Sequence, residues 1–245
     1  MAKSAYDLTT TRKHLNMSEI PRKPDGVKLR VLCLHGIGTN CEIFEAQTAA
    51  LRYQLRHAFN FEFIGGEHPW PAARGIAEVF GRDEVCYSYF DGTPSGALSA
   101  VEDLADYVAE NGPFDAIMGF SLGATLSVMF LFNWSKLGFV ESPFKFAILL
   151  SSCLPCDWDA LQMRRLEFMD PTQVTAPIKV PTIHCWSPQD TEYPGESRLV
   201  MEMCDASNRV NLQHSAGHNP PTQPGEVDKL AQVILDVSKI TTQPQ

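Results

Sequence analysis

The sequence predicts an α/β fold in which helices cover both faces of a mostly parallel sheet, and two patterns carry that prediction. Segments with strand character alternate along the chain with segments of helical spacing, which is typical of a parallel sheet. Several of the strand segments are largely apolar runs, which is typical of strands buried on both faces. With 245 residues and no repeat or linker, the chain fits a single domain over 27–245, preceded by a polar N-terminal extension at 1–26.

In the first half of the chain, we expect two strands, two helices and one long loop. An apolar run at 27–34 stops at a His-Gly pair and predicts a strand, and apolar residues at helical spacing predict a helix over 41–59. A short strand at 61–64 ends at two glycines. The stretch 65–96 is rich in Gly, Pro and aromatic residues and predicts a structured loop. An apolar stripe predicts an amphipathic helix over 97–110.

The second half repeats the strand and helix pattern four times. Apolar runs predict strands at 114–120, 144–150, 180–186 and 208–213. Helices are expected at 121–137, 160–168, 195–204 and 226–240. Functional groups of such folds gather at the carboxyl ends of the strands, so a site is expected in the loops after Leu34, Phe120, Trp186 and Gln213.

The charge and the apolar segments restrict the classes of partner. The chain carries a formal net charge of −9 and has no run of basic residues, so nucleic acid and an anionic membrane surface would both repel it. The longest apolar region, 114–134, approaches the length of a membrane span. Asp115, Gly119, Ser121 and Gly123 interrupt it, however, which favours a buried strand, a tight turn and a buried helix. We therefore expect neither a nucleic-acid nor a membrane partner.

Cysteine usage and the chain ends predict a cytoplasmic location. The seven cysteines are an odd number spread through apolar segments, which favours reduced thiols. Residues 1–26 lack the apolar core of a secretory signal, and the final Thr-Gln-Pro-Gln is not a peroxisomal address. The pair in Cys153-Leu-Pro-Cys156 could form a redox motif or half of a zinc site. No second ligand pair accompanies it, so we expect two structural loop cysteines, with no metal or cofactor.

The strongest chemical signal is Gly119-Phe-Ser-Leu-Gly123, which lies between a predicted strand and a predicted helix. In that setting G-x-S-x-G is typical of a nucleophile elbow, a sharp turn that exposes the serine at the start of a helix. The helix N-terminus favours negative charge nearby. Ser121 is therefore the candidate nucleophile.

A serine nucleophile needs a base, and the base needs an acid that orients it. In this arrangement the order along the chain is serine, acid, histidine, and only His184, His214 and His218 follow Ser121. His184 lies inside a predicted strand, which favours a core position. His218 stands in a loop after the last strand and is the preferred base, with His214 as the alternative.

The acid and the oxyanion donors are expected in two other loops. Asp190 lies in the loop directly after the strand at 180–186 and is the preferred acid; Glu192 and Asp205 are the alternatives. An oxyanion hole needs two backbone N–H donors. We assign one to Leu122 and the other to Ile37 in the glycine-containing turn after the first strand, with Gly38 as the second choice. His35 in that turn is expected to brace the loop by hydrogen bonding.

The sequence resembles the fungal serine-hydrolase family of small α/β-hydrolases, and especially its thioesterases that act beside polyketide synthases. The resemblance extends from about residue 27 to 240. The segments that carry it are Leu32-Cys-Leu-His-Gly-Ile-Gly-Thr-Asn-Cys-Glu-Ile-Phe-Glu-Ala-Gln47, Tyr87-Ser-Tyr-Phe-Asp91, Gly119-Phe-Ser-Leu-Gly-Ala124, Val180-Pro-Thr-Ile-His-Cys-Trp-Ser-Pro-Gln-Asp190 and Gly217-His218. It implies the α/β-hydrolase fold and a catalytic triad at Ser121, Asp190 and His218.

The resemblance further implies a substrate, namely a polyketide acyl chain released from an acyl carrier domain in secondary metabolism. Leu122 departs from the family pattern, because many relatives carry Gln or Glu after the serine. This apolar side chain predicts a more apolar acyl pocket. The stretch 153–176 and an aromatic-rich loop are expected to wall that pocket, although half or more of these residues could serve only core packing. The loop aromatics are Trp70, Tyr87, Tyr89 and Phe90.

Three other functions remain open from the sequence alone. A general carboxylesterase that acts on small acyl esters would use the same three residues. A non-catalytic binding protein with this fold is possible, but such proteins usually lack a member of the triad. An acyltransferase or cyclase would keep the triad and exclude water from the acyl-enzyme.

Overall fold

The central feature of the computed structural model, which describes residues 27–242, is a six-stranded parallel sheet. Its strands lie in the order β2-β1-β5-β6-β7-β8, and every neighbouring pair runs parallel. Each pair of parallel strands needs a crossover connection, and the helices between the strands supply it. The predicted N-terminal extension at 1–26 lies outside the described residues.

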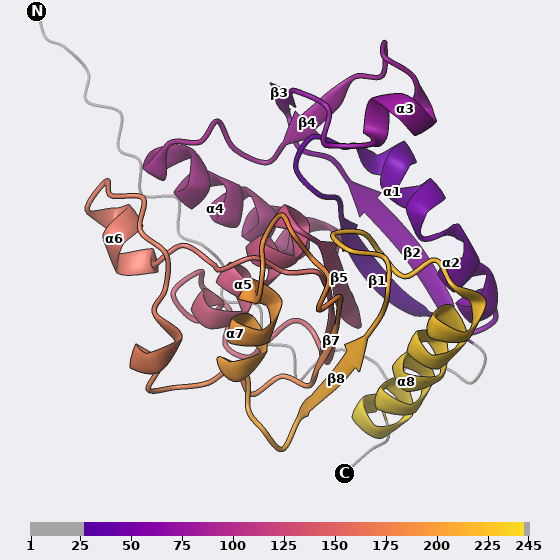
Figure 1. Cartoon of the computed structure of the whole chain (residues 1–245). Helices are drawn as coiled ribbons and strands as arrows, with labels where there is room; N and C mark the ends of the chain where they lie inside the picture. The colour runs from indigo at the N-terminus through magenta and orange to yellow at the C-terminus, as the bar shows by residue number, and fades with distance from the viewer. Residues whose placement is uncertain (1–26, 243–245) are drawn as a thin grey trace, which may run out of the picture.

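The first half of the chain builds one edge and the middle of the sheet (Figure 1). The strands there are β1 (Leu29–Leu34), β2 (Phe59–Ile64) and β5 (Ala116–Phe120), together with the short β3 (His68–Trp70) and β4 (Cys86–Ser88). The helices are α1 (Cys41–Gln47), α2 (Ala49–Leu55), α3 (Ile76–Phe80) and α4 (Pro94–Asn111).

The second half completes the sheet and ends in a long helix. Its strands are β6 (Phe146–Leu150), β7 (Thr182–Trp186) and β8 (Arg209–Gln213). Its helices are α5 (Leu122–Asn133), α6 (Trp158–Gln162), the 3₁₀ turn η2 (Pro171–Gln173), α7 (Glu196–Glu202) and α8 (Pro224–Thr242).

Each face of the sheet has its own hydrophobic core. Along β1, Leu32 and Leu34 point to the face that α4 and α5 cover, whereas Val31 and Cys33 point to the face that α1, α2 and α8 cover. Successive side chains of a strand alternate between the two faces, and here both sets are fully buried. Figure 1 shows α8 and α2 together beside the sheet, with α4, α5 and α7 across from them. The predicted doubly covered parallel sheet is confirmed.

The structure corrects three predicted elements. The helix expected over 41–59 is two helices that meet at Thr48, whose hydroxyl donates to the Phe44 carbonyl at 2.7 Å. The loop expected over 65–96 holds α3 and a two-stranded antiparallel sheet, β3 with β4. The helix expected over 160–168 begins at Trp158 and ends at Gln162, and Phe168 instead pairs with Cys156 in an isolated bridge.

Within residues 27–242, no helix is both long enough and apolar enough to cross a bilayer. The apolar region at 114–134 is the buried strand β5, a turn and the buried helix α5, as its interrupting residues predicted.

Candidate active site

Ser121 occupies a strained turn between β5 and α5. Its φ of 51° and ψ of −117° are values that non-glycine residues rarely adopt, and such strain is typical of functional turns. Two glycines make the turn possible. A Cβ at Gly119 would collide with the backbone of Gly123 and Ala124, and a Cβ at Gly123 would collide with the Leu34 carbonyl. The turn leaves Ser121 at the N-terminus of α5, where the helix dipole favours negative charge.

His218 and Asp190 continue a chain of hydrogen bonds from Ser121. His218 Nε2 lies 2.8 Å from Ser121 Oγ, and His218 Nδ1 lies 2.7 Å from Asp190 Oδ2. The side chains of His218 and Asp190 are 7% and 5% exposed, so water is largely excluded from their contact. The three residues come from the loops after β5, β7 and β8, which are three of the four loops indicated by the sequence.

The loop after β7 fixes Asp190. The backbone N–H groups of Glu192 and Tyr193 both donate to Asp190 Oδ1, at 2.9 and 3.0 Å, while Oδ2 faces His218. Burial by itself would raise the pKa of Asp190, but the Tyr193 N–H and the contact with His218 lower it more, so the pKa lies below its usual value. Asp190 is therefore held as a carboxylate that faces the imidazole.

The side chains of the alternative residues do not take part in this chain of hydrogen bonds. Glu192 lines a cavity that Ser121 also lines, but its contact with Asp190 comes from its backbone N–H. His214 accepts a hydrogen bond at Nδ1 from the Ala216 N–H, and its Nε2 is buried without a partner among the described residues. Asp205 pairs with Lys179 at 2.6 Å, at the opposite end of β8 from His214. His184 is a buried core residue that contacts the Thr182 hydroxyl, as its position in a strand predicted.

The predicted oxyanion donors are the backbone N–H groups of Leu122 and Ile37. Leu122 is the first residue of α5, where backbone N–H groups have no intrahelical acceptor. Ile37 lines the same cavities as Ser121. The alternative donor, the Gly38 N–H, already donates to the Tyr87 carbonyl at 2.9 Å. The Gly38 N–H is therefore engaged elsewhere, and the assignment of the oxyanion donors to Leu122 and Ile37 stays a prediction.

His35 braces the turn that presents Ile37, as expected. Its Nε2 accepts the Gly66 N–H at 3.0 Å, which leaves Nδ1 as the donor to the Gly36 carbonyl at 2.7 Å. Burial lowers the pKa of His35 and favours this neutral form. The Tyr89 hydroxyl accepts the backbone N–H of His35 at 2.7 Å and donates to the Ile64 carbonyl.

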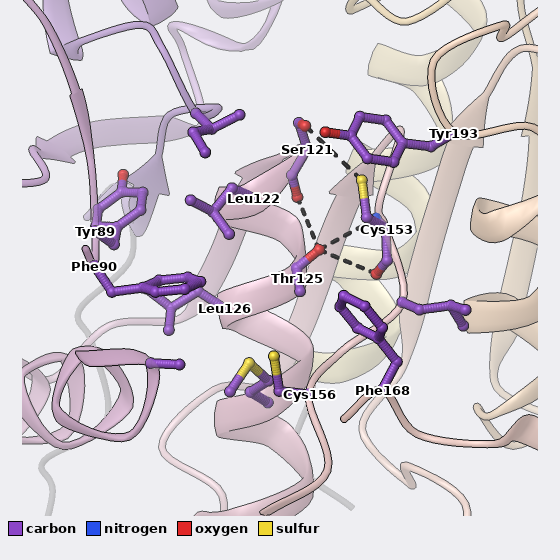
Figure 2. A pocket seen from close by; sticks show the side chains of 14 residues that line it. Tyr89, Phe90, Ser121, Leu122, Thr125, Leu126, Cys153, Cys156, Phe168 and Tyr193 are labelled. Carbon is purple, nitrogen blue, oxygen red and sulfur yellow. Dashed lines mark hydrogen bonds between the residues drawn. The ribbon is translucent and has the colours of Figure 1, made fainter. Parts of the chain in front are cut away.

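A cavity of about 170 Å³ lies beside Ser121 and is lined mainly by apolar side chains (Figure 2). Of the aromatic residues expected there, Tyr89 and Phe90 line it; Trp70 and Tyr87 are not among its lining residues. The stretch expected to wall the site contributes Cys153, Leu154, Cys156 and Phe168. The remaining lining residues are Ile37, Ala97, Leu122, Thr125, Leu126, Met129 and Tyr193.

The two cysteines of the Cys153-Leu-Pro-Cys156 motif are unpaired thiols that line this cavity. Cys153 Sγ lies 3.9 Å from Ser121 Oγ (Figure 2). Burial raises the pKa of the Cys153 thiol to about 12 and of the Cys156 thiol to about 11, so neither is held as a thiolate. Within residues 27–242, no group of three or more His, Cys, Asp or Glu side chains is arranged to hold a metal ion.

A second, smaller cavity of about 40 Å³ also reaches Ser121 and has a more polar lining. His218, Arg74 and Glu192 are among its lining residues, and Ile37 and Tyr193 line both cavities. Since His218 would protonate a departing group, this polar cavity suits the leaving group and the apolar one suits the acyl group.

Two positioning residues were not found from the sequence. Thr125 Oγ1 lies 3.2 Å from the Ser121 carbonyl and 3.0 Å from the Cys153 carbonyl, so it ties α5 to the loop after β6 (Figure 2). Tyr193 packs on the His218 ring with centroids 4.8 Å apart. Thr125 lies one helical turn after Ser121, a spacing from which its contact with the turn could have been predicted. No pattern in the sequence indicates the position of Tyr193.

Comparison with known families decides the identity of this fold and site. A family model described as "Serine hydrolase (FSH1)" matches residues 25–230. The chain belongs to this serine hydrolase family. It is therefore an enzyme, and the hypothesis of a non-catalytic binding protein is rejected.

Two fungal relatives match this serine hydrolase over most of their length. Esterase FPY3 of Fusarium mangiferae is 38% identical over 213 residues, which cover 85% of this chain and 96% of the relative. The probable esterase tazC of Aspergillus terreus is 30% identical over 253 residues, which cover 89% of this chain and 95% of the relative.

Solved structures support the fold. The crystal structure of esterase PE8 superposes with a TM-score of 0.60 at 17% identity, and the match covers 86% of this chain and 94% of that chain. The serine hydrolase therefore has the α/β-hydrolase fold that the sequence predicted.

Proposed function

We propose that this serine hydrolase cleaves acyl esters or thioesters through a covalent acyl intermediate on Ser121. His218 Nε2 takes the proton from Ser121 Oγ while that oxygen forms a bond to the acyl carbon, and an electron pair moves onto the carbonyl oxygen. Asp190 holds the proton on His218 Nδ1 and stabilises the imidazolium that forms. The N–H groups of Leu122 and Ile37 donate to the oxyanion.

The second half of the cycle restores the enzyme. When the oxyanion collapses, the bond to the alcohol oxygen or thiol sulfur breaks, and His218 gives its proton to that leaving group. A water molecule then attacks the acyl-serine, with His218 as the base again, and the carboxylic acid leaves. The cycle consumes one water molecule for each substrate molecule, and all of its catalytic groups belong to the protein.

The observation that carries this proposal is the pair of short contacts from His218. Its Nε2 lies 2.8 Å from Ser121 Oγ, and its Nδ1 lies 2.7 Å from Asp190 Oδ2. Both distances fall within the range expected between a nucleophile, its base and the orienting acid. The chain order Ser121, Asp190, His218 is also that of α/β-hydrolases.

For the physiological substrate, we favour a thioester whose acyl chain is a polyketide carried by an acyl carrier domain, in the cytoplasm. The sequence segments that resemble polyketide-releasing thioesterases support the substrate class, and Leu122 adds an apolar side chain to the acyl cavity. The seven cysteines are all unpaired, which suits a reducing compartment.

A general carboxylesterase is the second candidate, and two observations favour it. Both relatives described above carry the name esterase. The acyl cavity is also small, at about 170 Å³, which suits a small acyl group.

The test compares leaving groups while the acyl group stays fixed. Purified full-length protein is given the N-acetylcysteamine thioester and the ethyl ester of the same acyl group, with Ser121→Ala as the control. A higher kcat/KM on the thioester, together with its loss in the variant, supports the thioesterase. Cleavage of the ethyl ester alone, still dependent on Ser121, selects the carboxylesterase. If the folded wild-type protein cleaves neither those two nor any p-nitrophenyl ester, the proposed reaction is contradicted.

A further inference from the structure

The acyl cavity runs along one face of α5. Ser121, Thr125 and Met129 line it at intervals of four residues, and Leu122 and Leu126 line it at the same interval. Residues four apart lie above one another on a helix, so these side chains form one continuous wall. With a rise of about 1.5 Å per residue, the wall extends roughly 12 Å from Ser121 to Met129. An acyl chain attached to Ser121 Oγ would lie along this wall.

The end of the cavity away from Ser121 is closed. Figure 2 shows Cys156 at the end opposite Ser121. Met129, Cys156 and Ala97 all line the cavity and are only 3%, 5% and 1% exposed, and they come from α5, the loop after β6 and α4. All three belong to the hydrophobic core on this face of the sheet. A chain that extends past these three residues would have to displace buried core residues.

The volume of the cavity sets the size of the group that fits. An engineered cavity of about 150 Å³ in another protein, lined by apolar side chains, stays dry and binds benzene. The cavity here, at about 170 Å³ and with a mainly apolar lining, is of the same size. It therefore accommodates a group of roughly six to eight carbons.

We propose that the enzyme is selective for short apolar acyl groups of up to about eight carbons, and that Met129 sets this limit as the floor of the acyl cavity. The proposal rests on the proposed acyl-Ser121 reaction and limits the size of its acyl group. A polyketide chain that fits would be a short one, and the same limit applies to the acyl group of a carboxylesterase substrate. Each methylene that enters the apolar cavity is expected to raise kcat/KM by up to about fourfold. Beyond the limit, kcat/KM should fall sharply, because a close-packed protein interior accommodates added carbons only with strain.

A competing route lies beside the floor, at Phe168, which pairs with Cys156 in an isolated bridge. Phe168 lines the cavity, yet it is 62% exposed, unlike the residues at the floor. A long chain could leave past Phe168 instead of reaching Met129. In that case the rate would not depend on residue 129, so the same experiment distinguishes the two routes.

The experiment measures kcat/KM for p-nitrophenyl esters from two to fourteen carbons. Met129→Ala removes three heavy atoms from the floor and is expected to move the preferred chain about three carbons longer. Ala97→Val adds bulk at the same end and is expected to move the preference shorter. Met203→Ala is the matched control, because Met203 is a fully buried methionine outside the cavity lining. It should lower thermal stability and leave the preference unchanged. Circular dichroism melts establish that each variant is folded.

Each result decides the matter. A wild-type preference at eight carbons or fewer, with opposite shifts in the two floor variants, supports the proposal. Equal rates on eight-carbon and fourteen-carbon esters overturn the size limit. A short preference that neither floor variant moves overturns the role of Met129. In the last two cases the esters are still hydrolysed, so the proposed reaction stands; no hydrolysis of any ester by folded wild-type protein contradicts that reaction instead.

Discussion

Tyr193 packs against the imidazole of His218, with ring centroids 4.8 Å apart and an angle of 48° between the rings. The same residue donates its backbone N–H to Asp190 at 3.0 Å. One residue therefore contacts both the proposed base and the proposed acid, and it also lines both cavities that reach Ser121. Its position indicates that the ring holds the His218 imidazole in place.

Replacing Tyr193 separates the effect of its ring from that of its hydroxyl. Tyr193→Phe keeps the ring, so kcat/KM on a p-nitrophenyl ester should stay within about threefold of wild type. Tyr193→Ala removes a ring contact worth about 0.5–1.5 kcal/mol and should lower kcat/KM by up to about tenfold. Steady-state kinetics measure both. An equal loss in the two variants would assign the effect to the hydroxyl and contradict the role given to the ring.

The predicted fold was correct where it depended on clear apolar patterns in the sequence. Apolar runs identified β5 and β6 as strands, and an apolar stripe identified α4 as a helix. Burial imposes these patterns on the local sequence, so they can be recognised there. The pairing of β3 with β4 was missed, since each strand has three residues and one contains Pro69. The break at Thr48 was also missed, because a threonine hydroxyl that bonds a carbonyl four residues back is compatible with a continuing helix.

Asp190→Asn should lower kcat by about four orders of magnitude, as loss of the orienting carboxylate does in comparable triads. The Glu192 and Tyr193 N–H groups would hold the amide oxygen, so the NH2 group would face His218 Nδ1, donate to it and favour the wrong tautomer. Asp205→Asn is the matched control, because it makes the same change in charge at a carboxylate paired with Lys179. Its kcat should stay within about twofold. An Asp190→Asn enzyme that kept a tenth of wild-type activity would contradict the assignment.

Gly123→Ala should destabilise the protein and reduce activity together. The added Cβ would collide with the carbonyl oxygens of Leu34 and His35, which forces the start of α5 away from β1. Overpacking of this kind costs about 1–3 kcal/mol. Gly225→Ala is the matched control, because nothing lies within 4 Å of the added Cβ there. Denaturant unfolding measures both variants. Equal stability in the two would contradict the close packing around the turn.

His184 should make stability depend on pH. Burial, with a contribution from Arg209, lowers its pKa to about 3 in the folded chain. The unfolded chain takes up this proton near the ordinary value of about 6.5. The free energy of unfolding is therefore highest above about pH 6.5 and declines as the pH falls from there toward 3, because the unfolded chain then binds a proton that the folded chain does not.

His184→Gln removes this proton uptake and provides the test. The free energy of unfolding, measured between pH 6 and pH 4, should fall less steeply in the variant than in wild type, whatever the stability of the variant at neutral pH. Parallel curves would mean that the folded chain protonates His184 as readily as the unfolded chain does.

The candidate site was accessible from sequence because its three side chains lie in loops that follow strands. Parallel strands present their carboxyl ends at one edge, so Ser121, Asp190 and His218 meet there although 97 residues separate the first from the last. The neighbours that shape the site were accessible only as regions: the stretch 153–176 and the aromatic loop were expected to wall the pocket, but their individual contacts were not predicted. Cys153 lies beside Ser121, and Met129 lies at the floor of the cavity, only because separate elements pack together. No local pattern encodes those contacts.

Covalent labelling tests the role of Ser121 as the nucleophile most directly. A fluorophosphonate reacts with an activated serine hydroxyl and leaves a stable adduct whose position peptide mass spectrometry identifies. We predict one adduct on Ser121 in wild-type protein, none in folded Ser121→Ala, and labelling slowed by orders of magnitude in His218→Ala. The nearby Cys153 should carry no adduct, since burial raises the pKa of its thiol to about 12. Labelling of folded Ser121→Ala at the wild-type rate, or of another residue in wild type, would contradict the assignment of Ser121 as the nucleophile.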